Sequence, residues 1–234
     1  MTINDRLNAV EWDRVTADLN GQGWATTGAL LTSDECEALV SSYDDDGLFR
    51  STITMARHGF GRGEYRYFAY PLPDLVGQLR EALYGRLVGL ANEWRDAPAS
   101  GEGFSSDHGE FLARCHAAGQ KRPTPLLLRY RPGDYNCLHQ DVYGDLAFPL
   151  QEAFLLTDPK DFEGGEFVLT EQRPRMQSRV HVVPLRAGEA VIFAVNHRPV
   201  RGTKRNYGVT MRHGVSPLRS ASRHTLGIIL HDAA

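Results

Sequence analysis

The sequence is poor in cysteine and has no long hydrophobic run. Its three cysteines, Cys36, Cys115 and Cys137, are odd in number and irregularly spaced, which favours neither a disulfide framework nor a CxxC zinc site. The first residues include acidic and basic side chains instead of the apolar stretch of a signal peptide, and no later segment approaches the ~20 apolar residues that span a bilayer. We therefore expect a soluble, cytoplasmic protein with reduced cysteines and no membrane association.

The size of the chain bounds its domain organisation. A length of 234 residues with 41% hydrophobic content is enough for one sizeable core. The residue pattern changes to short strands from residue 124 onward. We predict one domain over residues 1–234, in which N-terminal helices and a hairpin (1–123) support a β-rich core (124–234).

Charge is distributed unevenly along the chain. The formal net charge is −3, yet residues 171–224 hold eleven Lys or Arg and two Glu, a net of +9, so the remainder carries −12. This division predicts either a basic face that attracts an anionic substrate or nucleic acid, or pairing of the basic segment with the acidic part. Charge alone leaves both alternatives open.

The N-terminal part combines helical and strand patterns. Helices are expected at residues 8–19, 32–39, 75–94 and 111–118, a strand at 25–31, two strands within 50–70, and a loop at 97–103. Thr32 and Glu35 have the spacing of a capping box, which begins the second helix. We interpret the run Gly-Phe-Gly-Arg-Gly at 59–63 as a hairpin turn instead of a phosphate loop, because no lysine follows it and no helix opens there.

The C-terminal part is a series of short strands separated by turn residues. They are expected at 125–131, 135–141, 147–157, 166–170, 179–185, 190–195, 207–213 and 224–231. Eight strands of this kind favour a jelly roll. The predicted fold class is therefore α+β, with a double-stranded β-helix (jelly-roll) core and an N-terminal helical elaboration.

One triplet, His139-Gln140-Asp141, carries a chemical signal. Residues two apart in a strand point to the same side, so His139 and Asp141 can bind one metal while Gln140 faces away. Two imidazoles and one carboxylate form the facial triad of non-haem Fe(II) oxygenases. The triplet alone is weak evidence, and what strengthens it is its place on a predicted strand.

The order of segments around the triplet resembles a known family. An Arg-Tyr-Arg-Pro-Gly-Asp run (129–134) precedes it, an apolar strand and an Asp-Phe-Glu-Gly-Gly-Glu-Phe turn (161–167) follow it, and Gly-Glu-Ala-Val-Ile-Phe (188–193) comes next. This order resembles the Fe(II)/2-oxoglutarate-dependent dioxygenases, in particular the prolyl 4-hydroxylase-like branch. The resemblance covers roughly residues 126–231 and implies the double-stranded β-helix fold.

The resemblance also implies roles for individual residues. His139 and Asp141 would be the first two iron ligands and His213 the third, with Arg223, ten residues later, binding the distal carboxylate of 2-oxoglutarate. We expect the Ser-Pro-Leu-Arg-Ser turn (216–220) to place Arg223 on the strand beside His213, where a guanidinium can pair with a carboxylate through two hydrogen bonds. Tyr130 matches a position whose hydroxyl bonds the cosubstrate, although a core role for it stays open.

Two other histidines compete for the third position. His197 and His181 are the alternatives, but only His213 has an arginine at the spacing that the family shows. The chain also departs from the family pattern, since Phe-Leu-Leu-Thr (154–157) stands where some hydroxylases have a tyrosine near the cosubstrate. That departure leaves part of the cosubstrate pocket undefined.

The implied enzyme is an oxidoreductase that uses Fe(II), 2-oxoglutarate and O2 and releases succinate and CO2. Its substrate is less defined. The basic segment 197–207 is a candidate lid for an anionic substrate, and the substrate-binding candidates are Arg201, Arg205, Tyr207 and Arg66. The full-length pattern resembles a bacterial oxygenase family labelled as oxidative demethylation of damaged DNA. A small-molecule or amino-acid hydroxylase, a cupin-like metalloprotein without 2-oxoglutarate, and a catalytically inactive binding module are the alternatives.

Overall fold

The computed structural model describes residues 1–95, 103–202 and 206–234. Its helices are α1 (Ile3–Asn8), α2 (Trp12–Gln22), α3 (Ser33–Ser41), α4 (Asp74–Trp94) and α5 (His108–Ala117), with short 3-10 turns at η1 (Ser42–Asp44), η2 (Asp46–Leu48), η3 (Met55–Arg57) and η4 (Pro159–Asp161). No helix within the described residues is both long and apolar enough to cross a bilayer. The loop predicted at 97–103 falls almost entirely outside the described residues.

Local capping explains where the N-terminal helices begin. Thr32 and Glu35 form the predicted capping box, each bonding the backbone N–H of the other, and α3 starts directly after Thr32. The helix predicted at 8–19 is α2, shifted by three to four residues, and a second capping box at Thr2 and Asp5 begins the additional helix α1. That helix ends at Asn8, and α2 begins at Trp12.

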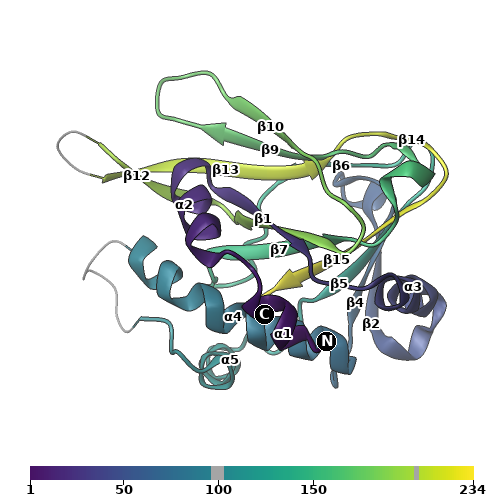
Figure 1. Ribbon diagram of the computed structural model, residues 1–234, viewed down its shortest axis with the longest axis horizontal. Helices are drawn as coiled ribbons and strands as arrows, with labels where there is room; N and C mark the ends of the chain where they lie inside the picture. Colours follow the sequence, from purple (N-terminus) through teal and green to yellow (C-terminus); the bar gives the residue numbers. More distant parts are fainter. Residues whose placement is uncertain (96–102, 203–205) are drawn as a thin grey trace.

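Seven strands form a large antiparallel sheet (Figure 1). Their order across the sheet is β1 (Trp24–Ala29), β11 (Glu189–Ala194), β7 (Leu150–Leu155), β15 (Arg223–Ile229), β5 (Leu126–Tyr130), β4 (Glu64–Phe68) and β2 (Phe49–Thr54). The N-terminal part thus supplies β1, β4 and β2 to the same sheet as the C-terminal strands. The domain division at residue 124 stays a prediction.

A smaller antiparallel sheet faces the large one (Figure 1). Its order is β10 (Arg179–Val183), β9 (Phe167–Gln172), β13 (Asn206–Val215), β6 (Tyr135–His139) and β3 (Gly61–Arg62), with β12 (His197–Arg201) also paired to β13, and β14 (Leu218–Ser220) pairs separately with β8 (Glu163–Gly164). The eight predicted strands are all present. The segment predicted as a lid, 197–207, instead contributes β12 to a hairpin with β13, and residues 203–205 lie outside the described part.

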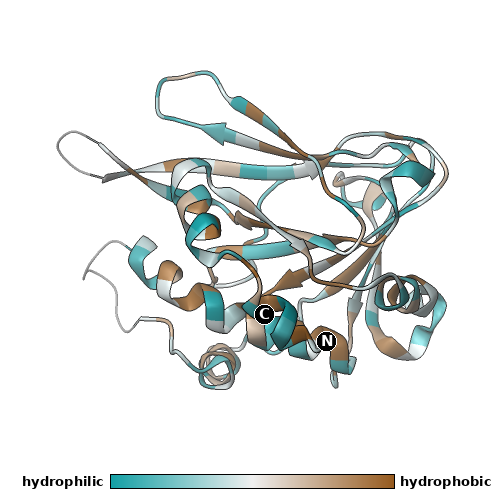
Figure 2. Cartoon of the chain, viewed as in Figure 1, coloured by the Kyte–Doolittle hydropathy of each residue, from teal (hydrophilic) through white to brown (hydrophobic). Residues whose placement is uncertain are grey.

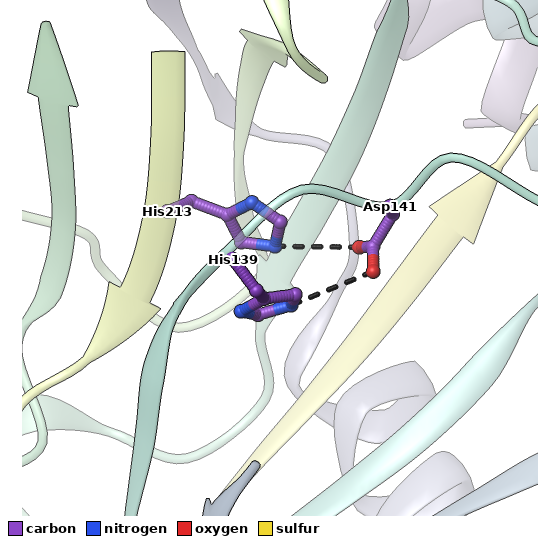
Figure 3. A group of neighbouring side chains, drawn as sticks. All are labelled: His139, Asp141 and His213. Carbon is purple, nitrogen blue, oxygen red and sulfur yellow. Dashed lines mark ion pairs between the residues drawn. The ribbon is translucent and has the colours of Figure 1, made fainter. Parts of the chain in front are cut away.

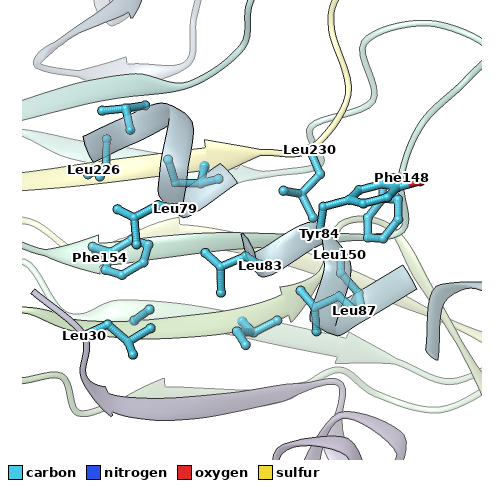
Figure 4. Packing of buried hydrophobic residues seen from close by; sticks show 14 of the residues in the cluster. Leu30, Leu79, Leu83, Tyr84, Leu87, Phe148, Leu150, Phe154, Leu226 and Leu230 are labelled. Carbon is cyan, nitrogen blue, oxygen red and sulfur yellow. The ribbon is translucent and has the colours of Figure 1, made fainter. Parts of the chain in front are cut away.

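Hydrophobic residues hold the layers together on both faces of the large sheet. On the outer face, Leu83 and Leu87 of α4 pack with Phe154 of β7 and Leu226 of β15 (Figure 4). Between the sheets, Leu155 clusters with Phe167 of β9. In the large sheet β15 is largely hydrophobic, whereas the tip of the β9–β10 hairpin is hydrophilic (Figure 2). The α+β class with a jelly-roll core is the predicted one.

Candidate metal centre

Three side chains converge between the sheets near one end of β6. His139 is the last residue of β6, His213 is its cross-strand partner on β13, and Asp141 follows two residues after His139. Possible ligand atoms of the three all lie within 4.8 Å of one another. Nε2 of His139 is 3.5 Å from Oδ1 of Asp141, and Nε2 of His213 is 3.3 Å from Oδ2 (Figure 3).

The backbone at the triplet differs from the prediction in one respect. Strand β6 ends at His139, so Asp141 is not within the strand that was predicted to run to residue 141. The amide of Gln140 donates hydrogen bonds to the carbonyls of Asn196 (3.1 Å) and Met211 (2.8 Å). These bonds fix the chain as it leaves the sheet, and the carboxylate of Asp141 still reaches both histidines.

Both histidines present Nε2 to the site. Nδ1 of His139 donates to the Cys137 carbonyl at 2.7 Å, which holds the ring with Nε2 directed at the site. The ring of His213 packs near Phe193, with a centroid distance of 4.6 Å, and near Phe167, at 6.0 Å. Burial lowers the pKa of His213, and the neighbouring His139 lowers it further, against the opposing effect of Asp141.

The carboxylate of Asp141 has a hydrogen-bond donor on each oxygen. The Tyr143 hydroxyl donates to Oδ1 at 2.7 Å and the Gln151 amide donates to Oδ2 at 2.9 Å. Burial alone would raise the pKa of Asp141, but bonding to His213, the charges of both histidines and the Tyr143 hydroxyl hold it well below its usual range. Asp141 is therefore an anion, with its orientation fixed by two neighbours.

The three residues line a partly open cavity of about 200 Å³. Its walls come from both sheets and include Leu128 and Tyr130 of β5, Thr225 of β15 and Phe193 of β11. A second cavity of about 590 Å³ is lined by Arg223 and by Phe167, which also borders the first. Tyr130, the cross-strand partner of Arg223, lines the first cavity, whereas Arg223 itself lines the second.

Arg223 lies in the large sheet and not beside His213 as predicted. It begins β15, which runs between β7 and β5, and its cross-strand partner is Tyr130, whereas His213 belongs to the small sheet. The turn at 216–220 includes β14, which carries the chain from one sheet to the other. Arg223 thus lies on the large sheet, which faces the small sheet that carries His213 and His139.

The guanidinium of Arg223 is buried without an anion. It is 2% exposed, lies 5.6 Å from the centroid of the Tyr130 ring, and donates one hydrogen bond, at 2.7 Å, to the Thr225 hydroxyl. Among the described residues it forms no ion pair, and neither its Nε nor the Tyr130 hydroxyl has a hydrogen-bond partner. Burial lowers the pKa of Arg223 and raises that of Tyr130 to about 12. A buried cation beside an unpartnered hydroxyl is a site for a carboxylate.

Comparison with known proteins gives the family. Residues 63–233 match the model of the Oxygenase-NA family, described as oxygenases catalysing oxidative methylation of damaged DNA. The chain belongs to the Oxygenase-NA family. Two proteins of Mycobacterium tuberculosis, both named as uncharacterized, are 44% identical over 173 residues, which are 71% of this chain and 72% of theirs.

Solved structures show the same fold for this Oxygenase-NA member. A prolyl-4-hydroxylase of Pseudomonas putida is 17% identical with a TM-score of 0.54, over 92% of this chain and 96% of its own. A prolyl hydroxylase of Trichoplax adhaerens is 15% identical with a TM-score of 0.58, over 96% and 90%. A 2-oxoglutarate-Fe(II) oxygenase of Burkholderia pseudomallei is 15% identical with a TM-score of 0.52, over 97% and 94%. The family match confirms the prediction of an oxygenase, and the structure brings the predicted two histidines and one aspartate together.

The rival histidines lie away from the triad of the oxygenase. His197 is exposed on β12, opposite Thr210. His181, on β10, packs edge-on against Trp24, with ring centroids 5.9 Å apart. Of these candidates, the structure brings only His213 to His139 and Asp141.

The predicted substrate residues lie outside the lining of the metal cavity, as far as the structure describes them. Arg66 is bonded to Asp46, to Thr52 and to the Tyr43 carbonyl. Tyr207 packs against the main hydrophobic core. The side chain of Arg201 and all of Arg205 are outside the described residues.

Two residues that donate hydrogen bonds to Asp141 were not predicted from the sequence of this oxygenase. Gln151 and Glu152 are two adjacent polar residues in a strand that is otherwise apolar, Leu-Gln-Glu-Ala-Phe-Leu, and that exception is the signal that could have drawn attention to Gln151. Tyr143, two residues after Asp141, follows the same side-chain alternation as the triplet. Both signals are local in the sequence. The fold was needed to show that both side chains donate hydrogen bonds to Asp141.

Proposed function

We propose that His139, Asp141 and His213 hold Fe(II), that Arg223 and Tyr130 bind the distal carboxylate of 2-oxoglutarate, and that the substrate is an alkylated base in nucleic acid. One observation carries the proposal. A buried guanidinium, that of Arg223, has no ion pair among the described residues and lies beside Tyr130, which lines the cavity that contains two imidazoles and a carboxylate. This arrangement suits a metal at one end and a dicarboxylate that reaches to the other.

The donor set fits Fe(II). Neutral imidazole nitrogens and one carboxylate are the protein ligands of non-haem iron oxygenases, and they leave positions for cosubstrate and O2. Once bound with 2-oxoglutarate, the iron supplies oxidation of a substrate C–H bond, with succinate and CO2 as the other products. The chain's own residues keep the ligands in their binding states: Cys137 fixes the tautomer of His139, and Tyr143 and Gln151 orient Asp141.

The cosubstrate site is argued from unsatisfied groups. A carboxylate can accept hydrogen bonds from Nε of Arg223 and from the Tyr130 hydroxyl, two buried donors that have no partner within the described chain. Pairing would also compensate a cation that burial otherwise disfavours. Thr225 holds the guanidinium in place through its hydroxyl.

The substrate class rests on the family description and on cavity size. About 200 Å³ lies below the ~300–1,000 Å³ of usual small-molecule sites, so a substrate can insert only a small reacting group beside the cosubstrate. Oxidising a methyl group on a base nitrogen removes it as formaldehyde, so we propose demethylation of a damaged base. The second candidate is a small-molecule or amino-acid hydroxylase, which the largely apolar lining favours.

Anaerobic visible absorption tests the reaction centre. Fe(II) followed by 2-oxoglutarate should give a charge-transfer band that needs both additions, and Arg223→Ala should require far more 2-oxoglutarate. Absence of the band in folded, iron-loaded protein would contradict the assigned ligands. Substrate-stimulated succinate release then separates the two candidates, since methylated single-stranded DNA should stimulate it and free amino acids should not.

A further inference from the structure

A loop between β2 and β4 places an aromatic ring at the metal cavity. The loop covers residues 55–63, and Phe60 within it is one of the residues that line the cavity. The Phe60 side chain is nevertheless 48% exposed. A single exposed phenylalanine is common on protein surfaces. The residues around Phe60 therefore decide whether it has a role in binding.

The backbone holds this ring in place. The Cys137 N–H donates to the Phe60 carbonyl at 2.9 Å, and the Phe60 N–H donates to the Met55 carbonyl at 3.2 Å. Met55 is fully buried with Tyr130 and anchors the start of the loop. At Gly61, with φ of +129°, a Cβ would lie 2.3 Å from the Tyr135 carbonyl, so only glycine permits this close approach of β3 to β6. Phe60 is therefore tied to the strand that ends at His139.

A second ring extends the exposed aromatic surface. His58 stacks on Phe60 with ring centroids 5.3 Å apart and an interplanar angle of 23°. His58 is itself exposed, so the pair packs into none of the hydrophobic clusters of the described residues. A fixed, solvent-facing pair of stacked rings presents a flat surface suited to another planar group.

Positive charge flanks the pair on both sides in the sequence. Arg57 precedes His58 and Arg62 follows Gly61, and both arginines are exposed. Neither forms an ion pair within the part of the chain that the structure describes. Free guanidinium groups beside exposed rings are the combination that binds single-stranded nucleic acid, with bases on the rings and phosphates on the cations.

We propose that the His58–Phe60 pair is a stacking platform for the base next to the target base in single-stranded DNA, with Arg57 and Arg62 contacting the adjoining phosphates. The inference deepens the proposed function and rests on it. A target base that inserts its methyl group into the cavity leaves the neighbouring base close to Phe60, which lines the cavity and is half exposed. The platform would select a strand over a free base or nucleoside.

Fluorescence anisotropy tests the platform directly. The full chain, loaded with Mn(II) and N-oxalylglycine as inert counterparts of iron and cosubstrate, is titrated into a labelled single strand of about ten nucleotides with one N-methylated base. A second strand has abasic sites on both sides of that base. The variants are Phe60→Ala, Phe60→Trp and the double change Arg57→Gln with Arg62→Gln; Val180→Ala, exposed on β10, is the control.

The expected pattern is specific. Wild type should bind the first strand about tenfold more tightly than the abasic strand, Phe60→Ala should lose that preference, and Phe60→Trp should keep it. The double arginine change should reduce the slope of log affinity against log salt by about 1.4, which corresponds to two phosphates on a single strand. Equal Mn(II) affinity in all variants, measured by electron paramagnetic resonance, shows that each is folded.

Two results would overturn the inference in distinguishable ways. If wild type binds DNA but Phe60→Ala binds both strands as wild type does, the platform is wrong and the proposed substrate class survives. If wild type binds neither strand at low salt, the nucleic-acid substrate is wrong and the platform with it, while the iron and 2-oxoglutarate assignments stand. Binding of a proline-containing peptide instead would assign the mouth to a polypeptide.

Discussion

The side-chain amide of Gln151 donates a hydrogen bond of 2.9 Å to Oδ2 of Asp141, and the two residues come from opposite sheets. Gln151 belongs to β7 of the large sheet, and Asp141 follows β6 of the small one. The bond therefore fixes the orientation of the carboxylate relative to histidines that both lie on the small sheet.

Gln151→Leu should lower metal affinity, because the carboxylate loses the donor that orients it. Loss of such a partner typically costs about 10- to 100-fold in metal affinity. Titration with Mn(II), followed by electron paramagnetic resonance, measures this without turnover. Gln78→Leu, at an exposed position of α4, is the matched control and should bind as wild type does. Unchanged affinity in Gln151→Leu would mean that Tyr143 alone orients Asp141.

Arg223→Met should have opposite effects on stability and cosubstrate binding. Removing a buried cation that has no anion should leave the protein without 2-oxoglutarate as stable as wild type or more so. The same change should weaken 2-oxoglutarate binding by about 100-fold or more, while Arg223→Lys keeps a part of it as a point charge. Thermal unfolding with and without 2-oxoglutarate measures both effects. A large loss of stability in its absence would assign Arg223 a structural role.

Glu152→Gln should change how stability depends on pH. Burial raises the pKa of Glu152 well above its usual value, against the opposing charge of Arg80, and neither carboxylate oxygen has a hydrogen-bond partner within the described residues. Above a pKa of about 4.3 the unfolded chain releases this proton while the folded chain keeps it, so folding stability falls by up to about 1.4 kcal/mol per pH unit until the folded pKa is reached.

The glutamine variant lacks this proton, so its melting temperature should vary less between pH 5.5 and pH 8 and should exceed that of wild type at pH 8. Glu37→Gln, exposed on α3, is the control and should follow the wild-type profile. The same pH profile in wild type and Glu152→Gln would show that another group carries the dependence.

Glu171→Gln should destabilise the protein strongly. Glu171 on β9 pairs with the buried Arg198 at 2.6 Å and with Arg173, also at 2.6 Å. Neutralising it leaves Arg198 buried and uncompensated, which costs about 3–5 kcal/mol of unfolding free energy. Urea unfolding measures the loss. The double change Glu171→Met with Arg198→Met should recover much of it, and a double variant as unstable as the single one would contradict this account.

The positions of the strands could be predicted from the sequence better than the pairing of the strands within the sheets. Side-chain alternation is local, so the eight strands from residue 124 onward and helix α4 were recognisable. Sheet membership depends on long-range pairing, and for that reason Arg223 was expected beside His213 when it pairs with Tyr130 instead. Arg198, counted within a basic surface segment, is buried because Glu171 lies across from it in the fold.

The candidate site shows the same division between local and long-range information. The spacing of His139 and Asp141 could be read directly, and His213 followed from the family resemblance. Gln151 and Phe60 could not be assigned, since the first acts across the gap between sheets and the second depends on the bonds that fix its loop. Arg66 was expected at the substrate and is held by Asp46 and Tyr43.

If 2-oxoglutarate binds as proposed, the distribution of the site over two sheets would make it a non-covalent cross-link. The metal ligands come from the small sheet or its continuation, and Arg223, Tyr130 and Thr225 come from the large one. A molecule bound to both groups ties the layers together, so unfolding either layer requires its release. Stabilisation should then grow with the logarithm of 2-oxoglutarate concentration above the dissociation constant, and amide hydrogens should exchange more slowly in β13 and β15 alike. The enzyme without bound 2-oxoglutarate would be the more flexible form, and its rigidity would increase with the concentration of 2-oxoglutarate.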